Sequence, residues 1–421
     1  MADVIKIGVV GCARIFPAHL RGLKAIQEKG FDNWRITALC DYKADFALMF
    51  RKRGEGPAPR PSVIKYMVDD PLNAPHQYVS DLHPDTIPDV YTDWRTMLKE
   101  AKIDAVLVLT SVSLHHQVAI DSLRAGKHVL VEKPFSISVR AGQRMLEEAD
   151  KRNLSLGVAE VVRYREEMCR APKWVIDSGQ IGKLQMWISG GMGAPDWSPD
   201  VIIAKTAWRH KKLEGGGGPA VDGAVHLFDW IRYLCGEIDE ISAMAPQFEP
   251  VRVIRDEQGN VIESVKNEVE DAYFAHLKFK NGAVGEIFGG VAGHGEPTGM
   301  KDGVAIYGSK GVLKGGEIVL DGGARFEVRK LFAEQAPAEL KERWFPRGVQ
   351  DGFGLEDLDW LQSIERGTKM ETDGVEAVRD LACSYAILES ATLNRPVKVD
   401  DVLAGKVDAY QREIDEHYGL L

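Results

Sequence analysis

The residues in this sequence whose types and spacing best suit catalysis are an aspartate and a histidine four positions apart, Asp222 and His226. They directly follow a run of glycines. In a helix, residues at this spacing share a face, so the carboxylate can orient the imidazole or raise its pKa. Such a pair suits general acid–base catalysis on a hydroxyl group. A structural explanation competes, because the helix dipole favours an N-terminal aspartate and a histidine can be a satisfied core residue. Spacing alone slightly favours this structural explanation.

A second candidate is Lys133, in the stretch VLVEKPF, which follows a buried strand and precedes Pro134. The proline restricts Lys133 to an extended conformation and so fixes its direction. At the carboxyl end of a central strand, an ammonium group can hydrogen-bond a substrate hydroxyl and ease the loss of its proton. Lys-Pro pairs are also common in loops, so the motif is modest evidence when taken alone.

A metal site is a third possibility. Asp222, His226 and Asp229 carry suitable ligand atoms, but no second histidine or cysteine stands at ligand spacing. The adjacent His115 and His116 are expected on a helix, where they point in different directions. A Ser-His-Asp arrangement fails because the G-x-S-x-G turn is missing. We therefore predict neither a metal nor a serine nucleophile.

Two stretches compete for the phosphates of a dinucleotide. EGGGGPAVDG at 214–223 contains G-x-G-x-x-A and leads into a helix expected from Pro219 to Gly236. VIKIGVVGCARIF at 4–16 has only G-x-A-x-x-F, but it joins a strand to a helix, where such a loop belongs. Phe16 stands where a small residue usually lets helix and strand pack closely, so we expect local reorientation there. Context therefore assigns the phosphates to 4–16.

The type of dinucleotide depends on Asp41, which ends the second strand-like segment. An aspartate in this place accepts hydrogen bonds from the adenosine ribose hydroxyls and repels a 2′-phosphate, which predicts NAD in preference to NADP. Lys43 weakens that preference, and the competing explanation for Asp41 is a plain turn residue.

The elements that must position these residues follow from the hydrophobic pattern. The segments 4–10, 34–40, 103–110 and 127–132 have the composition of buried parallel strands, and helix-like stretches lie between them. This alternation predicts a doubly wound parallel sheet with helices on both faces. The Pro-rich stretch from Pro57 to Val90 shows no clear periodicity, and we interpret it as a long surface excursion that serves as a lid, an oligomer contact or neither.

Composition limits the function classes. With 421 residues and a formal charge of -10, the chain is long enough for two domains and lacks the basic excess that nucleic-acid or anionic-membrane binding needs. No apolar run approaches the roughly 20 residues of a membrane span, and the N-terminus shows no signal peptide. The five cysteines form no CxxC pair, which indicates reduced thiols and a cytoplasmic protein.

The motifs together resemble the Gfo/Idh/MocA family of oxidoreductases. The resemblance rests on IGVVGCARIFPAHL, the stretch from YTDWRTM to VEKP, GVAEVVRYR, WRHKKLEGGGGPAVDGAVHLFDWIRYLCG, AIYGSKGVL and NRPVKV. It implies an NAD-binding Rossmann domain in residues 1–153, with the insertion at about 57–90. It also implies a substrate-binding α/β domain in 154–421, whose large, mostly antiparallel open sheet often forms the oligomer interface. A homo-oligomer, a dimer or a tetramer, is therefore expected.

The resemblance also implies residue roles. His226 is the expected general base on the substrate hydroxyl, Lys133 polarises that oxygen and Asp222 supports the arrangement; these three and Arg163 are the expected substrate contacts. Cofactor contacts are expected from Gly11, Cys12, Ala13, Arg14, Ile15, Asp41, Thr110, His115, Glu132, Lys133, Trp208 and Arg209, the last two beside the nicotinamide.

The expected function is NAD-dependent oxidation of a secondary hydroxyl of a sugar, glycoside or polyol to a ketone, or the reverse. One alternative is glycoside hydrolysis or elimination through a transient NAD redox cycle, as in the glycosidase branch of the family. Another is a catalytically silent NAD-sensing protein, which the intact set of Lys133, Asp222 and His226 disfavours.

Overall fold

The computed structural model describes residues 4–60, 70–193, 206–256, 258 and 260–421. The chain forms two compact units, each described here by itself. The first comprises residues 1–137, 141–161 and 345–377, and the second comprises 138–140, 162–344 and 378–421.

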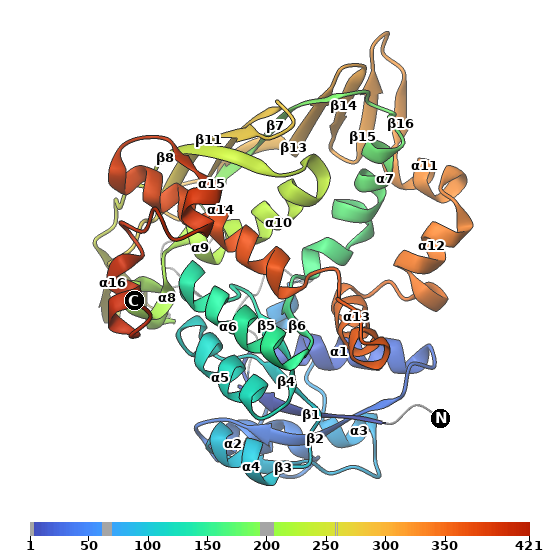
Figure 1. Cartoon of the computed structure of the whole chain (residues 1–421), viewed down its shortest axis with the longest axis vertical. Coiled ribbons are helices and arrows are strands. Elements are labelled where there is room, and N and C mark those ends of the chain that lie inside the picture. Colours follow the sequence, from blue (N-terminus) through green and yellow to red (C-terminus); the bar gives the residue numbers. More distant parts are fainter. Residues whose placement is uncertain (1–3, 61–69, 194–205, 257, 259) are drawn as a thin grey trace. The chain divides into compact units, whose positions relative to one another are not determined.

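The first unit is built on a six-stranded parallel sheet of order β3-β2-β1-β4-β5-β6 (Figure 1). Its strands are β1 (Ile5–Val10), β2 (Trp34–Cys40), β3 (Asp89–Tyr91), β4 (Ala105–Val108), β5 (His128–Glu132) and β6 (Leu156–Ala159). The strand order reverses between β1 and β4, and in such sheets a ligand binds at the carboxyl ends of the strands at this switch point. The predicted doubly wound parallel sheet is therefore confirmed.

The helices of this unit include one that comes from far along the chain. They are α1 (Phe16–Glu28), α2 (Ala44–Arg51), α3 (Val79–Leu82), α4 (Trp94–Glu100), α5 (Val112–Arg124), α6 (Val139–Arg152) and α13 (Gly352–Arg366). Figure 1 shows α13 beside α1. The two backbones approach closely, since a Cβ atom on Gly22 would lie 2.5 Å from the amide nitrogen of Gly354.

The stretch from Pro57 to Val90 differs in part from the predicted surface excursion. Residues 61–69 lie outside the described ranges, and the stretch that follows contains a short 3₁₀ helix (Pro71–Asn73) and α3. Val79 and Leu82 are buried, and the ring of His76 stacks on Phe50 at 4.7 Å between centroids. These residues pack into the core, which the lack of a helical or strand period did not indicate, while most of the described residues from 70 to 90 are exposed or half-buried. A role of this stretch as a lid or an oligomer contact stays a prediction.

The second unit contains a nine-stranded sheet of order β16-β15-β14-β13-β7-β12-β11-β8-β17. Among the strands described, neighbours are antiparallel except for the parallel pair of β7 and β12, so the predicted large, mostly antiparallel sheet is confirmed. Its strands are β7 (Leu184–Met192), β8 (Ile238–Met244), β11 (Ala272–Phe279), β12 (Val284–Gly290), β13 (Thr298–Gly308), β14 (Gly311–Lys314), β15 (Glu317–Leu320), β16 (Arg325–Glu327) and β17 (Val397–Lys398). A separate two-stranded ribbon pairs β9 (Val251–Arg255) with β10 (Val261–Lys266).

One face of the large sheet is buried and the other is open. In β11, Ala275, Leu277 and Phe279 are buried, whereas the alternating Phe274 and His276 are exposed. Strand residues point alternately to opposite faces, so this pattern assigns the faces directly.

The helices of this unit are α7 (Ala171–Asp177), α8 (Lys212–Gly215), α9 (Pro219–Asp222), α10 (Ala224–Cys235), α11 (Val328–Gln335), α12 (Ala338–Trp344), α14 (Gly374–Leu393), α15 (Val399–Leu403) and α16 (Arg412–His417); the first four residues of α14 belong to the first unit. None of the helices in the described ranges combines the length and the apolar character that a bilayer span requires.

Candidate active site

The turn from β1 to α1 is shaped for a phosphate-binding loop. Gly11 has a φ of 97°, and a Cβ atom there would lie 2.7 Å from the carbonyl carbon and oxygen of Leu109, so this position requires glycine. Cys12 is buried, while Ala13, Arg14 and Ile15 are half-buried. Phe16 begins α1 and is fully buried, with its ring edge-on to Phe50 at 5.0 Å. The large side chain is thus accommodated against α2.

Asp41 lies immediately after β2 and is hydrogen-bonded to the turn between β1 and α1. Its Oδ2 atom accepts the amide N–H of Cys12 at 2.8 Å, and Oδ1 lies 3.5 Å from the amide nitrogen of Lys43. Burial raises the pKa of Asp41, against the amide of Cys12 and the positive charge of Arg60, which both lower it. The Arg60 guanidinium carbon lies 4.3 Å from the ring centroid of Phe46. Arg60 is a charged neighbour of Asp41 that the sequence analysis missed.

His115 connects the loops that follow β4 and β5. Its Nδ1 lies 2.8 Å from the carbonyl oxygen of Pro134, and its Nε2 lies 3.0 Å from that of Thr110. Burial lowers the pKa of His115, and a neutral imidazole donates from one nitrogen only, so in that form one of the two contacts is a hydrogen bond. Lys133, half-buried, follows Glu132 at the end of β5, and its amide N–H donates to Glu132 Oε2 at 3.0 Å.

The second unit carries the Asp222 and His226 pair. The predicted single helix from Pro219 to Gly236 is two helices, α9 and α10, separated by Gly223. Asp222 ends α9, and His226 lies in the first turn of α10; both are half-buried.

Trp208 and Arg209 lie close to this pair in a 3₁₀ helix (Ala207–His210). Arg209 Nε donates to Asp222 Oδ2 at 2.9 Å, and the guanidinium carbon lies 4.3 Å from the Trp208 ring centroid. The structure thus brings together three predicted site residues: Trp208, Arg209 and Asp222.

Arg163 forms a buried ion pair with Asp229. Its Nε donates to Asp229 Oδ2 at 3.1 Å, a second nitrogen bonds the other oxygen, and both side chains are buried. The guanidinium carbon also lies 4.4 Å from the Tyr233 ring centroid. This pairing occupies Asp229, which the sequence analysis weighed as a metal ligand, and a substrate contact of Arg163 stays a prediction.

Glu270 is a functional neighbour that the sequence analysis missed. It is buried, and its Oε1 accepts the amide N–H of Ala220 at 2.9 Å, in the first turn of α9. It therefore anchors the helix that ends at Asp222. No motif marks Glu270, because its role depends on a contact between segments 50 positions apart.

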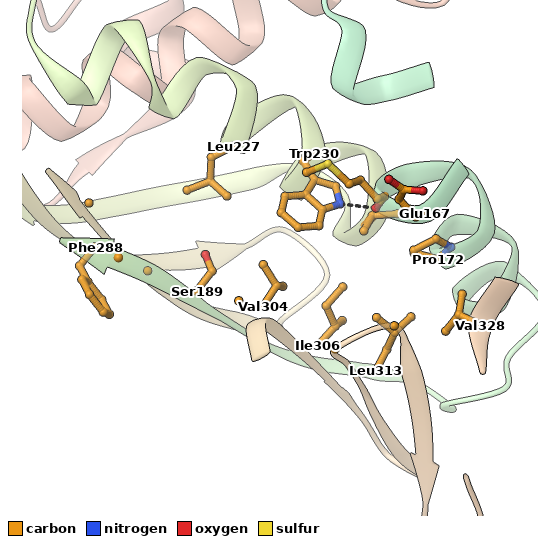
Figure 2. A pocket seen from close by; sticks show the side chains of 18 of the residues that line it. Glu167, Pro172, Ser189, Leu227, Trp230, Phe288, Val304, Ile306, Leu313 and Val328 are labelled. Carbon is orange, nitrogen blue, oxygen red and sulfur yellow. Dashed lines mark hydrogen bonds between the residues drawn. The ribbon is translucent and has the colours of Figure 1, made fainter. Parts of the chain in front are cut away.

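A cavity of about 490 Å³ lies between α10 and the large sheet, and all of its lining residues belong to the second unit. Figure 2 shows Leu227 and Trp230 facing Ser189, Val304 and Ile306 of the sheet across it, with the Trp230 Nε1 bond to the Met168 carbonyl at 2.6 Å. Its walls are mostly apolar. On α10, Leu227 and Leu234 line the cavity, whereas Ile231 is fully buried.

Two models of known protein families match this chain. The model described as "Oxidoreductase family, NAD-binding Rossmann fold" matches residues 5–160, and that of the "GFO/IDH/MocA C-terminal domain" matches residues 170–314. The chain belongs to the Gfo/Idh/MocA family. The resemblance seen in the sequence is thereby confirmed, and the first unit contains the family's NAD-binding Rossmann fold.

Several members of the Gfo/Idh/MocA family are similar over most of their length. Levoglucosan dehydrogenase of Pseudarthrobacter phenanthrenivorans is 25% identical over 339 residues, which cover 74% of this chain and 84% of that protein. Myo-inositol 2-dehydrogenase of Thermotoga maritima is 25% identical over 402 residues, 95% of this chain and 100% of that protein. The structure of a levoglucosan dehydrogenase in complex with NADH and levoglucosan superposes with a TM-score of 0.70 at 19% identity, covering 94% of this chain and 98% of the other.

Proposed function

We propose that this Gfo/Idh/MocA protein is an NAD-dependent dehydrogenase that oxidises a secondary hydroxyl of a sugar, glycoside or polyol to a ketone, or catalyses the reverse reaction. The observation that carries the proposal is the match of both family models, over residues 5–160 and 170–314. Lys133, Asp222 and His226 lie within these ranges, in the motifs by which the sequence resembles the family, and we propose that they are the catalytic residues. The similar proteins named for levoglucosan and myo-inositol support a sugar or polyol as the substrate class.

The cofactor proposal rests on the turn between β1 and α1. Gly11 packs against the Leu109 backbone at the turn where a pyrophosphate binds in such sheets, and Asp41, fixed by the Cys12 amide, offers carboxylate oxygens for ribose hydroxyls. Asp41 favours NAD because a carboxylate repels a 2′-phosphate. The positive charges of Arg60 and Lys43 near Asp41 weaken this preference for NAD, but the carboxylate of Asp41 still opposes a 2′-phosphate. Ala13, Arg14, Ile15, Thr110 and His115 are the further proposed contacts in this unit.

In the proposed reaction, NAD would supply the hydride acceptor for the substrate carbon when it is bound. His226 takes the hydroxyl proton, and the Lys133 ammonium donates a hydrogen bond to the same oxygen as negative charge develops on it. Asp222 is held by Arg209 and supports His226. Trp208 and Arg209 are proposed to lie beside the nicotinamide, and Arg163 is proposed to contact the substrate.

The test is the formation of NADH, followed by absorbance, with a panel of polyols, aldoses and glycosides. His226→Ala and Lys133→Ala should each lower turnover by about 10²- to 10⁴-fold, the usual contribution of a positioned acid or base. Both should still show thermal stabilisation by NAD that exceeds stabilisation by NADP.

His417→Ala, at an exposed histidine of α16, is the matched control and should keep full activity. Full activity in either catalytic variant would overturn the assignment of that residue. Stabilisation by NADP alone would overturn the role of Asp41, and product formation without net NADH would indicate the transient redox cycle instead.

The protein is further proposed to form a homo-oligomer through the open face of its large sheet. On that face, Phe274 is in cross-strand register with Met244 and Phe288, and Val284 is in register with Met186. Met244 is 68% exposed and Val284 is 51% exposed. The ion pair of His276 and Glu286 lies between these two groups on the same face. Exposed large apolar side chains grouped in this way mark an interaction site, and a second copy presents the same surface.

A further inference from the structure

A buried cluster in the first unit joins α1, β5 and α13 next to Lys133. His19 is fully buried; its Nε2 lies 3.2 Å from Glu132 Oε1 and its Nδ1 lies 3.1 Å from Asp357 Oδ1. Glu356, also fully buried, is the residue before Asp357 on α13. His19, Glu356 and Asp357 thus meet in the interior, and Glu132, whose side chain is 12% exposed, joins them through His19.

The contacts define the protonation of His19. Both of its nitrogens face carboxylate oxygens, which only accept, so the doubly protonated imidazolium satisfies both contacts. Burial by itself lowers the pKa of His19, but Asp357 and Glu132 outweigh it and raise that pKa well above the usual value.

Glu356 balances the charge of the cluster. Neither of its carboxyl oxygens has a hydrogen-bond partner among the described residues. An ionised carboxylate in that situation is costly, so the neutral acid is the favoured form, and burial accordingly raises its pKa well above the usual value.

The cluster acts on Lys133 through Glu132. One Glu132 oxygen faces His19, and the other accepts the amide N–H of Lys133 at 3.0 Å. We propose that His19, clamped by Asp357, is a positioning residue: it fixes the Glu132 carboxylate and thereby the backbone from which the Lys133 ammonium projects. This inference rests on the proposed catalytic role of Lys133.

The clamp depends on α13, which lies 338 positions from His19 in the chain. The close approach of Gly22 and Gly354 docks α13 on α1, and the ring of His19 also meets Phe353 edge-on at 5.1 Å. Residues 345–377 therefore do more than cover the sheet of the first unit. Through Asp357 they hold His19, which in turn contacts Glu132 next to the proposed catalytic Lys133.

A metal ion is the competing occupant of this cluster. His19, Glu356 and Asp357 place ligand-type atoms within 4.8 Å of one another. A metal ligand, however, must present a free nitrogen lone pair, and both His19 nitrogens face carboxylates here. The geometry therefore favours a proton over a metal.

The decisive experiment is a double-mutant cycle on turnover. His19→Gln removes the positive charge between the two carboxylates and replaces two separate ring donors by a single amide nitrogen. It should lower kcat by about 10- to 100-fold, the usual effect of losing a residue that orients a catalytic group. The NAD dissociation constant should change by less than about threefold, well below one tenfold step of affinity. In a Lys133→Ala background, His19→Gln should cause no further loss, because the two residues act through one path.

His128→Gln is the matched control, since His128 begins the strand that ends at Glu132 and bonds the Ser155 amide. It should leave kcat unchanged. Asp357→Asn serves if His19→Gln does not fold: it should lower kcat in the same direction and again only when Lys133 is present. Equal losses with and without Lys133 would overturn the inference.

Two measurements do not require turnover, so they separate this inference from the proposed function. Nitrogen-15 NMR of histidine should show His19 doubly protonated at about pH 8, above the ordinary imidazole pKa of about 6.5. A neutral His19 would overturn the inference, as would a stoichiometric metal in the purified protein that Glu356→Gln removes. An inactive wild type with a doubly protonated His19 would refute the proposed function and leave the clamp standing.

Discussion

Among single residues, Glu270 anchors α9 through a hydrogen bond, but its buried carboxyl group makes the stability of the fold depend on pH. Burial raises its pKa to about 7 from the usual value of 4.5. The folded state therefore favours the protonated acid. The stabilising contribution is fully present below pH 4.5 and is lost as the pH rises to about 7. Above that pH, the folded protein carries a buried carboxylate with one unpaired oxygen, Oε2, among the described atoms.

Glu270→Gln should remove this cost and keep the bond to the Ala220 amide. Relative to wild type, its free energy of unfolding should rise by about 1–3 kcal/mol between pH 4.5 and 7 and stay level above, since one pKa unit corresponds to about 1.4 kcal/mol. Denaturant unfolding at several pH values measures this difference. Glu263→Gln, at an exposed position of β10, should show no such pH dependence. A constant difference between wild type and Glu270→Gln would show that Glu270 does not titrate in this range.

Among elements, the crossing of α1 and α13 offers the sharpest test of how the first unit is held together. Gly22→Ala would place a methyl group 2.5 Å from the amide nitrogen of Gly354, and backbone cannot rotate away as a side chain can. We expect a loss of about 1–3 kcal/mol in the free energy of unfolding, the usual cost of overpacking. Urea unfolding measures it. Lys24→Ala, on the exposed side of α1, is the control and should stay within about 0.5 kcal/mol of wild type; equal effects of both variants would refute the close crossing.

The elements also show what a sequence pattern can and cannot predict. The four apolar segments predicted as strands were found because parallel strands buried on both faces are continuously apolar. In contrast, β3 has three residues, too few to establish a pattern, and β6 was not predicted although it is as long as β4. The break at Gly223 was missed because a single residue interrupts an otherwise regular helical period.

The residues of the candidate site likewise fall into those that the sequence could predict and those that it could not. Gly11 and Asp41 were predictable because their positions at strand ends follow from local chain order, and the structure places them together. The partners of His19 and Arg163 were not predictable, because they come from segments 338 and 66 positions away. Buried ion pairs leave no periodic signal, and only the tertiary fold brings their members into contact.

For the whole molecule, assembly through the open face of the large sheet is the property most directly tested. Phe274 lies on the open face of β11, 39% exposed, stacked on Phe288 and opposite Met244 in register. Phe274→Glu would place like charges across a two-fold interface, which disfavours association, while the exposed position leaves the fold of each copy intact. Light scattering should show wild type as a dimer or tetramer at roughly micromolar concentration and Phe274→Glu at a smaller mass. Ile262→Glu, 65% exposed on the separate β9–β10 ribbon, should keep the wild-type mass. A monomeric wild type would refute the proposed oligomer. Dissociation caused by Ile262→Glu alone would show that the interface lies at the β9–β10 ribbon and not on the open face of the large sheet.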